Sequence, residues 1–117
     1  MTFIQRRIFK PIQYSFCGLI QAWKNEEAFR VELIIGMPLL IYALTSNHIA
    51  THKILLCSSI FFVFAVELLN SGLEKTIDRI STEQHELSKI VKDIGSAAVL
   101  ISLLNFSVTW LLVLVSI

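Results

Sequence analysis

Charged residues, glycine, proline and cysteine are all scarce in this chain. Of its 117 residues, 16% are charged, whereas soluble domains average about 25%. The four glycines and two prolines are too few for a flexible linker, so residues 1–117 are interpreted as one domain. Cys17 and Cys57 lack a metal-like spacing. The composition therefore disfavours an ordinary soluble domain, a multidomain chain and a cysteine-based metal site.

Hydrophobic residues make up 55% of the chain, and its mean hydropathy is +0.69. A membrane-spanning helix needs roughly 20 residues. Three stretches approach that length, at about residues 28–46, 52–70 and 94–117. Three core helices of a soluble bundle are the alternative, disfavoured because little polar sequence remains to cover them. The net charge of +1 gives no indication of a nucleic-acid partner.

Basic residues cluster on one side of the predicted spans. Four precede the first span and four lie between the second and third, whereas the loop between the first two carries only Lys53. The clustered residues are Arg6, Arg7, Lys10, Lys24, Lys75, Arg79, Lys89 and Lys92. Because short loops rich in Lys and Arg stay in the cytoplasm, we expect a cytoplasmic N-terminus, a cytoplasmic 71–93 segment and an outward-facing C-terminus.

Residues 1–24 form an amphipathic segment, in which an apolar residue recurs every four positions. The apolar positions are Ile4, Ile8, Ile12, Phe16 and Ile20. This pattern is typical of a helix lying in the membrane interface with its basic face toward anionic headgroups. Trp23 is placed like an interfacial anchor. Pro11 lacks an amide donor and should kink this helix or begin a new one.

Acidic and amide side chains mark the end of the second apolar stretch. At about 100° per residue, Asn70, Glu74 and Asp78 all lie close to the direction of Glu67. Glu67 is expected in the cytoplasmic third of the bilayer. A charge at mid-membrane costs about 2.5–3.5 kcal/mol, and ionisable residues at depth are candidates for function. This polar stripe is therefore the first candidate site.

Further charged groups are predicted at the same membrane surface. NEEAFRVE, residues 25–32, brings carboxylates to the start of the first span, and Arg30, Lys89 and Lys92 offer positive partners. Carboxylates with a lysine suit Mg²⁺-assisted phosphoryl transfer, because Mg²⁺ is usually held by one or two carboxylates and the nucleotide phosphates. The sequence has no GxxxxGK[ST] motif and no glycine-rich loop, so spacing alone leaves this reaction a hypothesis.

In that hypothesis Glu67, the deepest acid, meets a lipid hydroxyl. Glu26 and Glu74 hold the metal, and Lys92 steadies a phosphate. Two other classes remain open on the residues alone. A small ion- or proton-translocating subunit would use Glu67 as its relay, whereas an assembly partner of larger membrane complexes would catalyse nothing.

Two smaller patterns carry structural predictions. Small residues open the third span and predict a close helix-packing face. These are Gly95, Ser96, Ala97 and Ala98. Tyr42 and Trp110 are placed like anchors at the membrane interface.

Three motifs, in this order along the chain, resemble the prokaryotic diacylglycerol kinase family: AWKNEEAFRVE, VELLNSGLEKTIDRI and HELSKIVKDIGSAAVLI. The similarity covers nearly the whole chain. It implies an all-α integral membrane fold of three transmembrane helices plus an N-terminal amphipathic interfacial helix, in a homotrimeric bundle with shared active sites. The implied reaction moves the γ-phosphoryl group of ATP to the primary hydroxyl of diacylglycerol, with Mg²⁺ as cofactor, and yields phosphatidic acid.

The same scaffold carries undecaprenol kinases, which are the alternative activity. NEEAFRVE and KDIGSAAVL look like the diacylglycerol branch, which is commoner in Gram-negative bacteria. The resemblance thus implies a multi-pass protein of the bacterial inner membrane with a periplasmic C-terminus. Pro11, Cys17 and Gln84 depart from the family pattern, which affects the surface-helix geometry and one nucleotide-loop contact.

The resemblance also implies residue roles, position by position. Glu67 looks like the catalytic base, supported by Asn70, and Glu26 and Glu74 look like the metal ligands. The positions that match family nucleotide contacts are Arg7, Tyr14, Glu26, Glu74, Glu83, His85, Lys92 and Asp93. The positions along the implied lipid path are Arg7, Trp23, Phe29, Arg30, Glu32, Glu67 and Ser96.

Overall fold

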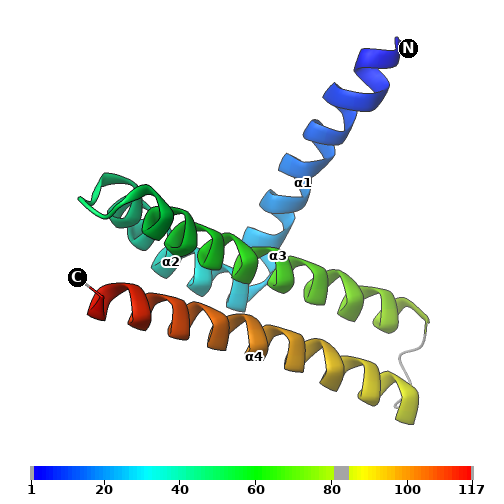
Figure 1. Cartoon of the computed structure of the whole chain (residues 1–117). Coiled ribbons are helices and arrows are strands. Elements are labelled where there is room, and N and C mark those ends of the chain that lie inside the picture. The colour runs from blue at the N-terminus through cyan, green and yellow to red at the C-terminus, as the bar shows by residue number, and fades with distance from the viewer. Residues whose placement is uncertain (1, 81–84, 117) are drawn as a thin grey trace.

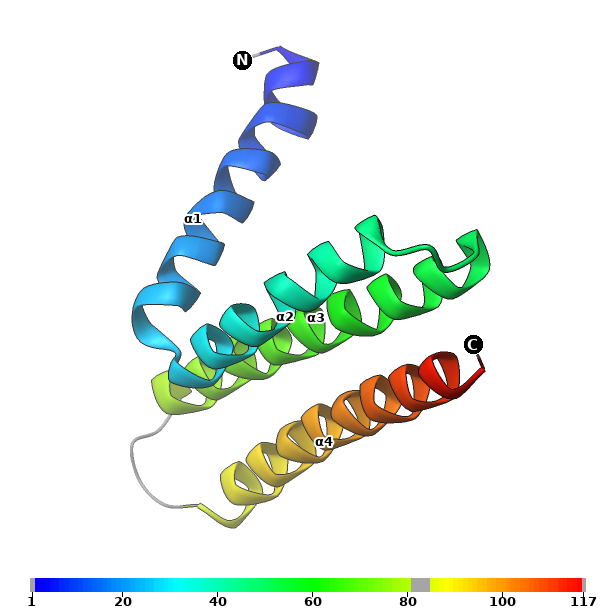
Figure 2. The ribbon, with the colours of Figure 1, turned by 90° about the vertical axis from the view of Figure 1, so that its left-hand side faces the viewer.

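The computed structural model describes residues 2–80 and 85–116, and this part of the chain is helical without strands. A short π-helix, η1 (Gln5–Phe9), precedes four α-helices. These are α1 (Lys10–Asn25), α2 (Glu27–Thr45), α3 (Ala50–Ile80) and α4 (Glu86–Val115). The central helix α3 packs against both α2 and α4, and α1 projects away from this bundle (Figures 1 and 2). The all-α prediction is confirmed.

The helices α2, α3 and α4 are each long and apolar enough to cross a membrane, as the sequence predicted. α3 has 31 residues and α4 has 30. At 1.5 Å per residue each measures about 45 Å, which exceeds a hydrocarbon core of about 30 Å. The excess length holds the polar turns 71–80 and 86–93. The charged residues therefore stand on continuous helical extensions of the apolar stretches.

Pro11 lies in the first turn of α1, where its missing amide costs no hydrogen bond. The helical segment continues through this proline, so the expected start of a new helix at Pro11 is not found. η1 runs directly into α1, so the residues before Pro11 extend the helix and form no separate arm (Figure 1). Ile8, Ile12 and Phe16 remain exposed, as expected for a helix whose apolar face meets a membrane surface.

The core lies between α2, α3 and α4 and centres on Ala43, Leu56 and Ile60. Trp110 belongs to it: only 8% of the residue is exposed, and its Nε1 donates to Ser59 Oγ at 3.1 Å. The prediction that Trp110 is an interfacial anchor is therefore wrong. An indole can be buried when its N–H finds an acceptor, and a serine one helix away supplies that acceptor.

Of the four small residues that open the third span, only Gly95 is buried within this chain. It faces Asn70 and Leu73 of α3. Ser96, Ala97 and Ala98 are exposed. The predicted close packing between helices is thus found at one residue, which lies directly beside the polar stripe of α3.

Candidate active site

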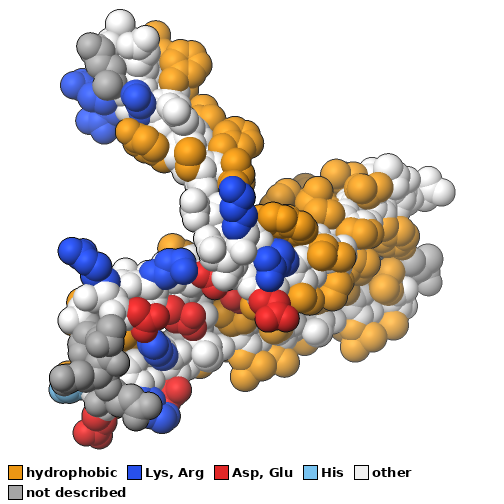
Figure 3. All heavy atoms as spheres, turned by 180° about the vertical axis from the view of Figure 1, so that it is seen from behind, with side chains coloured by type: hydrophobic (Ala, Val, Ile, Leu, Met, Phe, Trp, Pro, Cys, Tyr) orange, Lys and Arg blue, Asp and Glu red, His pale blue; other side chains and the backbone are white. Residues whose placement is uncertain are grey.

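Acidic and basic side chains gather over one end of the bundle and around the base of the N-terminal helix, while hydrophobic side chains cover the other end (Figure 3). The charged end includes the polar stripe of α3, the junction of α1 and α2, and the first turns of α4. The charged region therefore combines side chains of α3 and α4 with those of the α1–α2 junction.

Glu67 is the most deeply placed acid of this region, with 6% of the residue exposed. Its side chain lies within hydrogen-bonding reach of Glu32 on α2. Glu32 Oε2 is buried and has no hydrogen-bond partner among the described residues. The pair therefore joins carboxyl groups of α2 and α3.

Asn70 connects this acid pair to the next turn of α3. Its Nδ2 donates to Glu74 Oε1 at 3.4 Å, a long hydrogen bond. Its Oδ1 is buried and finds no partner within residues 2–80 and 85–116. The amide rests against Gly95 of α4, where a side chain would overlap it. Asn70 is thus held between two helices with one polar atom still available.

Glu26 stands at the junction of α1 and α2 in an extended backbone conformation. Its Oε1 lies 2.9 Å from Lys75 Nζ of α3. Glu74 lies about two helical turns from Glu67 on α3, so Glu26, Glu67 and Glu74 all belong to the charged end of the bundle. The junction itself is closed by Arg30, whose Nη1 donates to the main-chain oxygens of residues 23 and 24 at 3.3 and 3.2 Å.

Two further ion pairs occupy the first turns of α4. Lys92 Nζ lies 2.8 Å from Asp78 Oδ1 of α3, and Lys89 Nζ lies 2.7 Å from Asp93 Oδ2. His85 is the N-cap of α4, and its Nδ1 accepts a hydrogen bond from the Leu87 amide at 3.0 Å. Glu83 and Gln84 lie outside the described residues.

Several predicted residues stay apart from the acids within one chain. Arg7 and Tyr14 are exposed on the N-terminal helix, and this helix leads away from α3 and α4 (Figure 1). Trp23 is also exposed but lies at the base of that helix, where its main-chain oxygen accepts from Arg30. Ser96 is exposed on α4. Phe29 is 1% exposed and packs edge-on against Phe64, so it has no free surface for a lipid and supports the site by packing.

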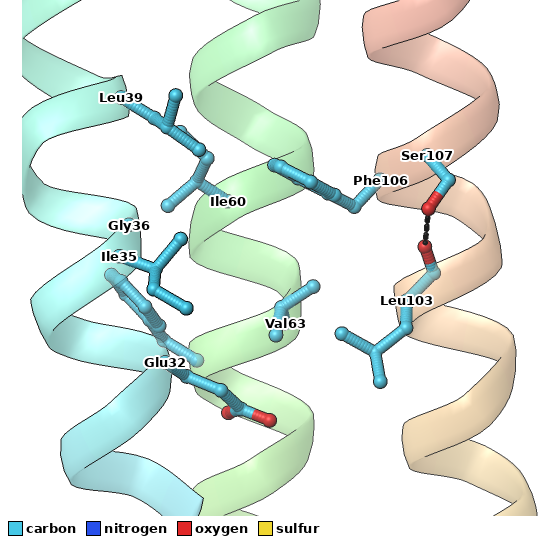
Figure 4. A pocket seen from close by; sticks show the side chains of 10 residues that line it. Glu32, Ile35, Gly36, Leu39, Ile60, Val63, Leu103, Phe106 and Ser107 are labelled. Carbon is cyan, nitrogen blue, oxygen red and sulfur yellow. Dashed lines mark hydrogen bonds between the residues drawn. The ribbon is translucent and has the colours of Figure 1, made fainter.

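An apolar groove of about 270 Å³ lies between α2, α3 and α4, next to the acids. Glu32 stands at one end of it, and side chains from all three helices line its walls (Figure 4). Ile35, Val63 and Leu103 are among these. The groove thus joins a carboxylate to an apolar surface.

Three features of the site were missed by sequence reasoning. These are the contact between Glu32 and Glu67, the seat of Asn70 on Gly95, and the ion pair of Lys75 with Glu26. Each joins two helices, so no spacing along one helix reports it. The sequence did contain a signal for two of these contacts. An acid, Glu32, stands in the first apolar stretch, and a small residue, Gly95, stands at the start of the third.

The model of the prokaryotic diacylglycerol kinase family matches residues 13–114. The chain belongs to this family. A diacylglycerol kinase of Escherichia coli strain K12 is 44% identical over 108 residues, which cover 92% of this chain and 88% of that protein. That of Haemophilus influenzae is 44% identical over 103 residues, with 88% and 87% covered. That of Pseudomonas aeruginosa is 37% identical over 109 residues, with 93% and 89% covered.

Membership of the prokaryotic diacylglycerol kinase family confirms the resemblance that the three motifs indicated. The resemblance also implied Mg²⁺, so we asked which side chains could hold a divalent cation. No group of three or more His, Cys, Asp or Glu side chains in the described part of the chain could hold a metal ion. Mg²⁺ needs only one or two carboxylates when nucleotide phosphates complete its shell. Glu26, at the α1–α2 junction, and Glu74, on α3, carry oxygen donors of the chemical type that Mg²⁺ bound to a nucleotide requires.

Proposed function

We propose that this chain phosphorylates diacylglycerol, transferring the γ-phosphoryl group of ATP to the primary hydroxyl of the lipid and releasing phosphatidic acid. One observation carries the proposal: buried Glu67 shares one face of α3 with Asn70, which is hydrogen-bonded to Glu74, in a member of the prokaryotic diacylglycerol kinase family. Phosphoryl transfer needs positioning, charge neutralisation and a group that receives the acceptor's proton.

Glu67 is the proposed general base. As the lipid oxygen bonds to the γ-phosphorus and the bond to ADP breaks, the hydroxyl proton passes to the Glu67 carboxylate. Its burial favours this role because a base held away from water meets the lipid hydroxyl and not bulk solvent. Asn70 keeps the neighbouring Glu74 in place through its amide.

Glu26 and Glu74 are the proposed metal-holding residues. Bound Mg²⁺ would neutralise the charge of the transferring phosphoryl group. The two carboxylates come from different elements, the α1–α2 junction and α3. Their approach therefore depends on the packing of the bundle, which the ion pair between Glu26 and Lys75 supports.

The proposed nucleotide contacts come from two regions that one chain keeps apart. The full set is Arg7, Tyr14, Glu26, Glu74, Glu83, His85, Lys92 and Asp93. Arg7 and Tyr14 lie on the helix that leaves the bundle (Figure 2). We therefore propose a homotrimer in which the N-terminal helix of one subunit completes the site of another.

The proposed lipid path runs from the N-terminal helix to the acid pair. Its polar members are Arg7, Arg30, Glu32, Glu67 and Ser96, with Trp23 at the interface and Phe29 behind them. The apolar groove beside Glu32 suits an acyl chain whose glycerol end must reach Glu67. The proposed setting is the bacterial inner membrane. The N-terminus is proposed to be cytoplasmic and the C-terminus periplasmic, because basic residues cluster before α2 and between α3 and α4, whereas the loop between α2 and α3 carries only Lys53.

The test is transfer of labelled γ-phosphate from MgATP to diacylglycerol and to undecaprenol, side by side in mixed micelles. Wild-type protein should label diacylglycerol preferentially. Preference for undecaprenol would keep the chemistry but replace the substrate. No labelling of either lipid by a correctly assembled sample would refute the kinase and favour a relay role for Glu67.

Glu67→Gln tests the assigned base within the same assay. The amide keeps the shape of the side chain but removes the proton acceptor, so we expect kcat to fall by about 10²- to 10⁴-fold. Helical content and oligomer size should stay as in the wild type. Glu27→Gln is the matched control, since Glu27 is exposed. Full activity of well-folded Glu67→Gln would remove Glu67 from the mechanism.

A further inference from the structure

Lys75 contacts a proposed metal ligand, yet neither the sequence motifs nor the proposed reaction gives its charge a role in binding the metal or the nucleotide. Its Nζ lies 2.9 Å from Glu26 Oε1. The Lys75 side chain is 65% exposed and that of Glu26 is 20% exposed, so the ammonium approaches a largely covered carboxylate from the solvent side. The carboxylates of Glu74 and Asp78 also attract this ammonium.

This ion pair joins α3 to the junction of α1 and α2. Glu26 is the residue between those two helices, and Lys75 directly follows Glu74 on α3. Lys75 and Glu26 line the same hollow of about 510 Å³ between α1 and α3. The Lys75 ammonium is therefore paired with one of the two carboxylates to which the proposed function assigns the metal, and it lies one residue from the other along α3.

We propose that Lys75 is the resting counter-ion of the metal site and exchanges partners when the metal–nucleotide complex binds. In the resting site, its positive charge offsets the repulsion between clustered carboxylates. When a divalent cation binds with its nucleotide, Glu26 would hold the cation and release the Lys75 ammonium. The ammonium would then pair with the anionic oxygens of the triphosphate. Lys75 is thus a positioning residue, which competes with the metal ion for Glu26 and favours binding of the nucleotide. This inference rests on the proposed function.

Lys75→Met removes the charge and keeps an unbranched side chain. The exchange predicts that this variant binds the metal ion more tightly and MgATP more weakly. Without nucleotide, affinity for Mn²⁺, measured from the EPR signal of the free ion, should rise about two- to fivefold, as for loss of a partly exposed ion pair. The KM for MgATP should rise by about the same factor. Lys75→Arg should keep both constants near the wild type.

Lys24→Met is the matched control, because it removes a lysine from the same membrane side. Among the described residues, Lys24 forms no ion pair with a carboxylate. Both constants should therefore stay unchanged in this variant. An equal change in Lys24→Met and Lys75→Met would refute the exchange, since the effect would then come from net charge alone.

Unchanged or weaker Mn²⁺ binding by Lys75→Met would overturn the exchange, and so would an unchanged KM for MgATP. Glu26→Gln separates this failure from failure of the proposed function. If Glu26→Gln leaves Mn²⁺ affinity as in the wild type, the metal role of Glu26 itself is refuted. If Glu26→Gln weakens Mn²⁺ binding while Lys75→Met has no effect, only the inference about Lys75 fails.

Discussion

Gly95→Ala tests whether the close approach of α3 and α4 positions the catalytic face. A methyl group at Gly95 would overlap Asn70 Oδ1 and lie 3.3 Å from Asn70 Cγ and 3.6 Å from Leu73 Cδ2. Asn70 cannot yield freely, because its Oδ1 is buried and its Nδ2 is bonded to Glu74. Either the helices separate or the amide turns away from Glu74.

Two opposing terms set the effect on stability. Overpacking a close contact costs about 1–3 kcal/mol, whereas replacing a helical glycine with alanine gains about 1 kcal/mol. We expect the free energy of unfolding to fall by about 0–2 kcal/mol. The effect on kcat should be larger, at least about tenfold, because a positioned hydrogen bond to a charged group is lost.

The assay is thermal unfolding in detergent, followed by circular dichroism, together with lipid phosphorylation on the same samples. Gly72→Ala is the matched control on α3, since a methyl group there would meet nothing within 4 Å and stability should not decrease. In the double variant Gly95→Ala, Asn70→Ala the overlap is relieved, so stability should return while activity stays low. Wild-type kcat in Gly95→Ala would refute the argument that Asn70 must hold its place.

Two further substitutions test other parts of the structure. Glu26→Gln should raise the Mg²⁺ concentration for half-maximal activity by at least about tenfold, the loss typical even of outer-shell partners of a metal. Glu27→Gln, one residue away and exposed, should leave that Mg²⁺ concentration unchanged. Equal effects of the two substitutions would contradict the assignment of Glu26 as a metal ligand. Trp110→Phe removes the bond to Ser59 Oγ and should lower the free energy of unfolding by about 1 kcal/mol. Tyr42→Phe, which alters an exposed hydrogen bond to His48, is the comparison, and a larger loss in that variant would contradict a core role for Trp110.

Much of the fold could be predicted because bilayer-spanning helices satisfy their backbone groups locally. Length, hydropathy and the apolar recurrence every four positions in residues 1–24 were enough to indicate three spans and a surface helix. The prediction for Trp110 failed, since a tryptophan near the end of an apolar stretch suits an interface unless a buried acceptor exists elsewhere in the chain. That acceptor, Ser59, stands 51 residues away, and sequence spacing has no access to such a contact.

The candidate site also has one part that the sequence predicts and another that only the tertiary structure shows. The stripe of Glu67, Asn70 and Glu74 follows from helical periodicity along one segment, so the sequence by itself determined it. The three motifs also determined the family. What only the tertiary structure decided is which groups face the stripe: Glu32 beside Glu67, Gly95 beneath Asn70, and Lys75 on Glu26. Each of these contacts depends on how two helices are rotated and offset against one another, and no periodicity within a single helix encodes that arrangement.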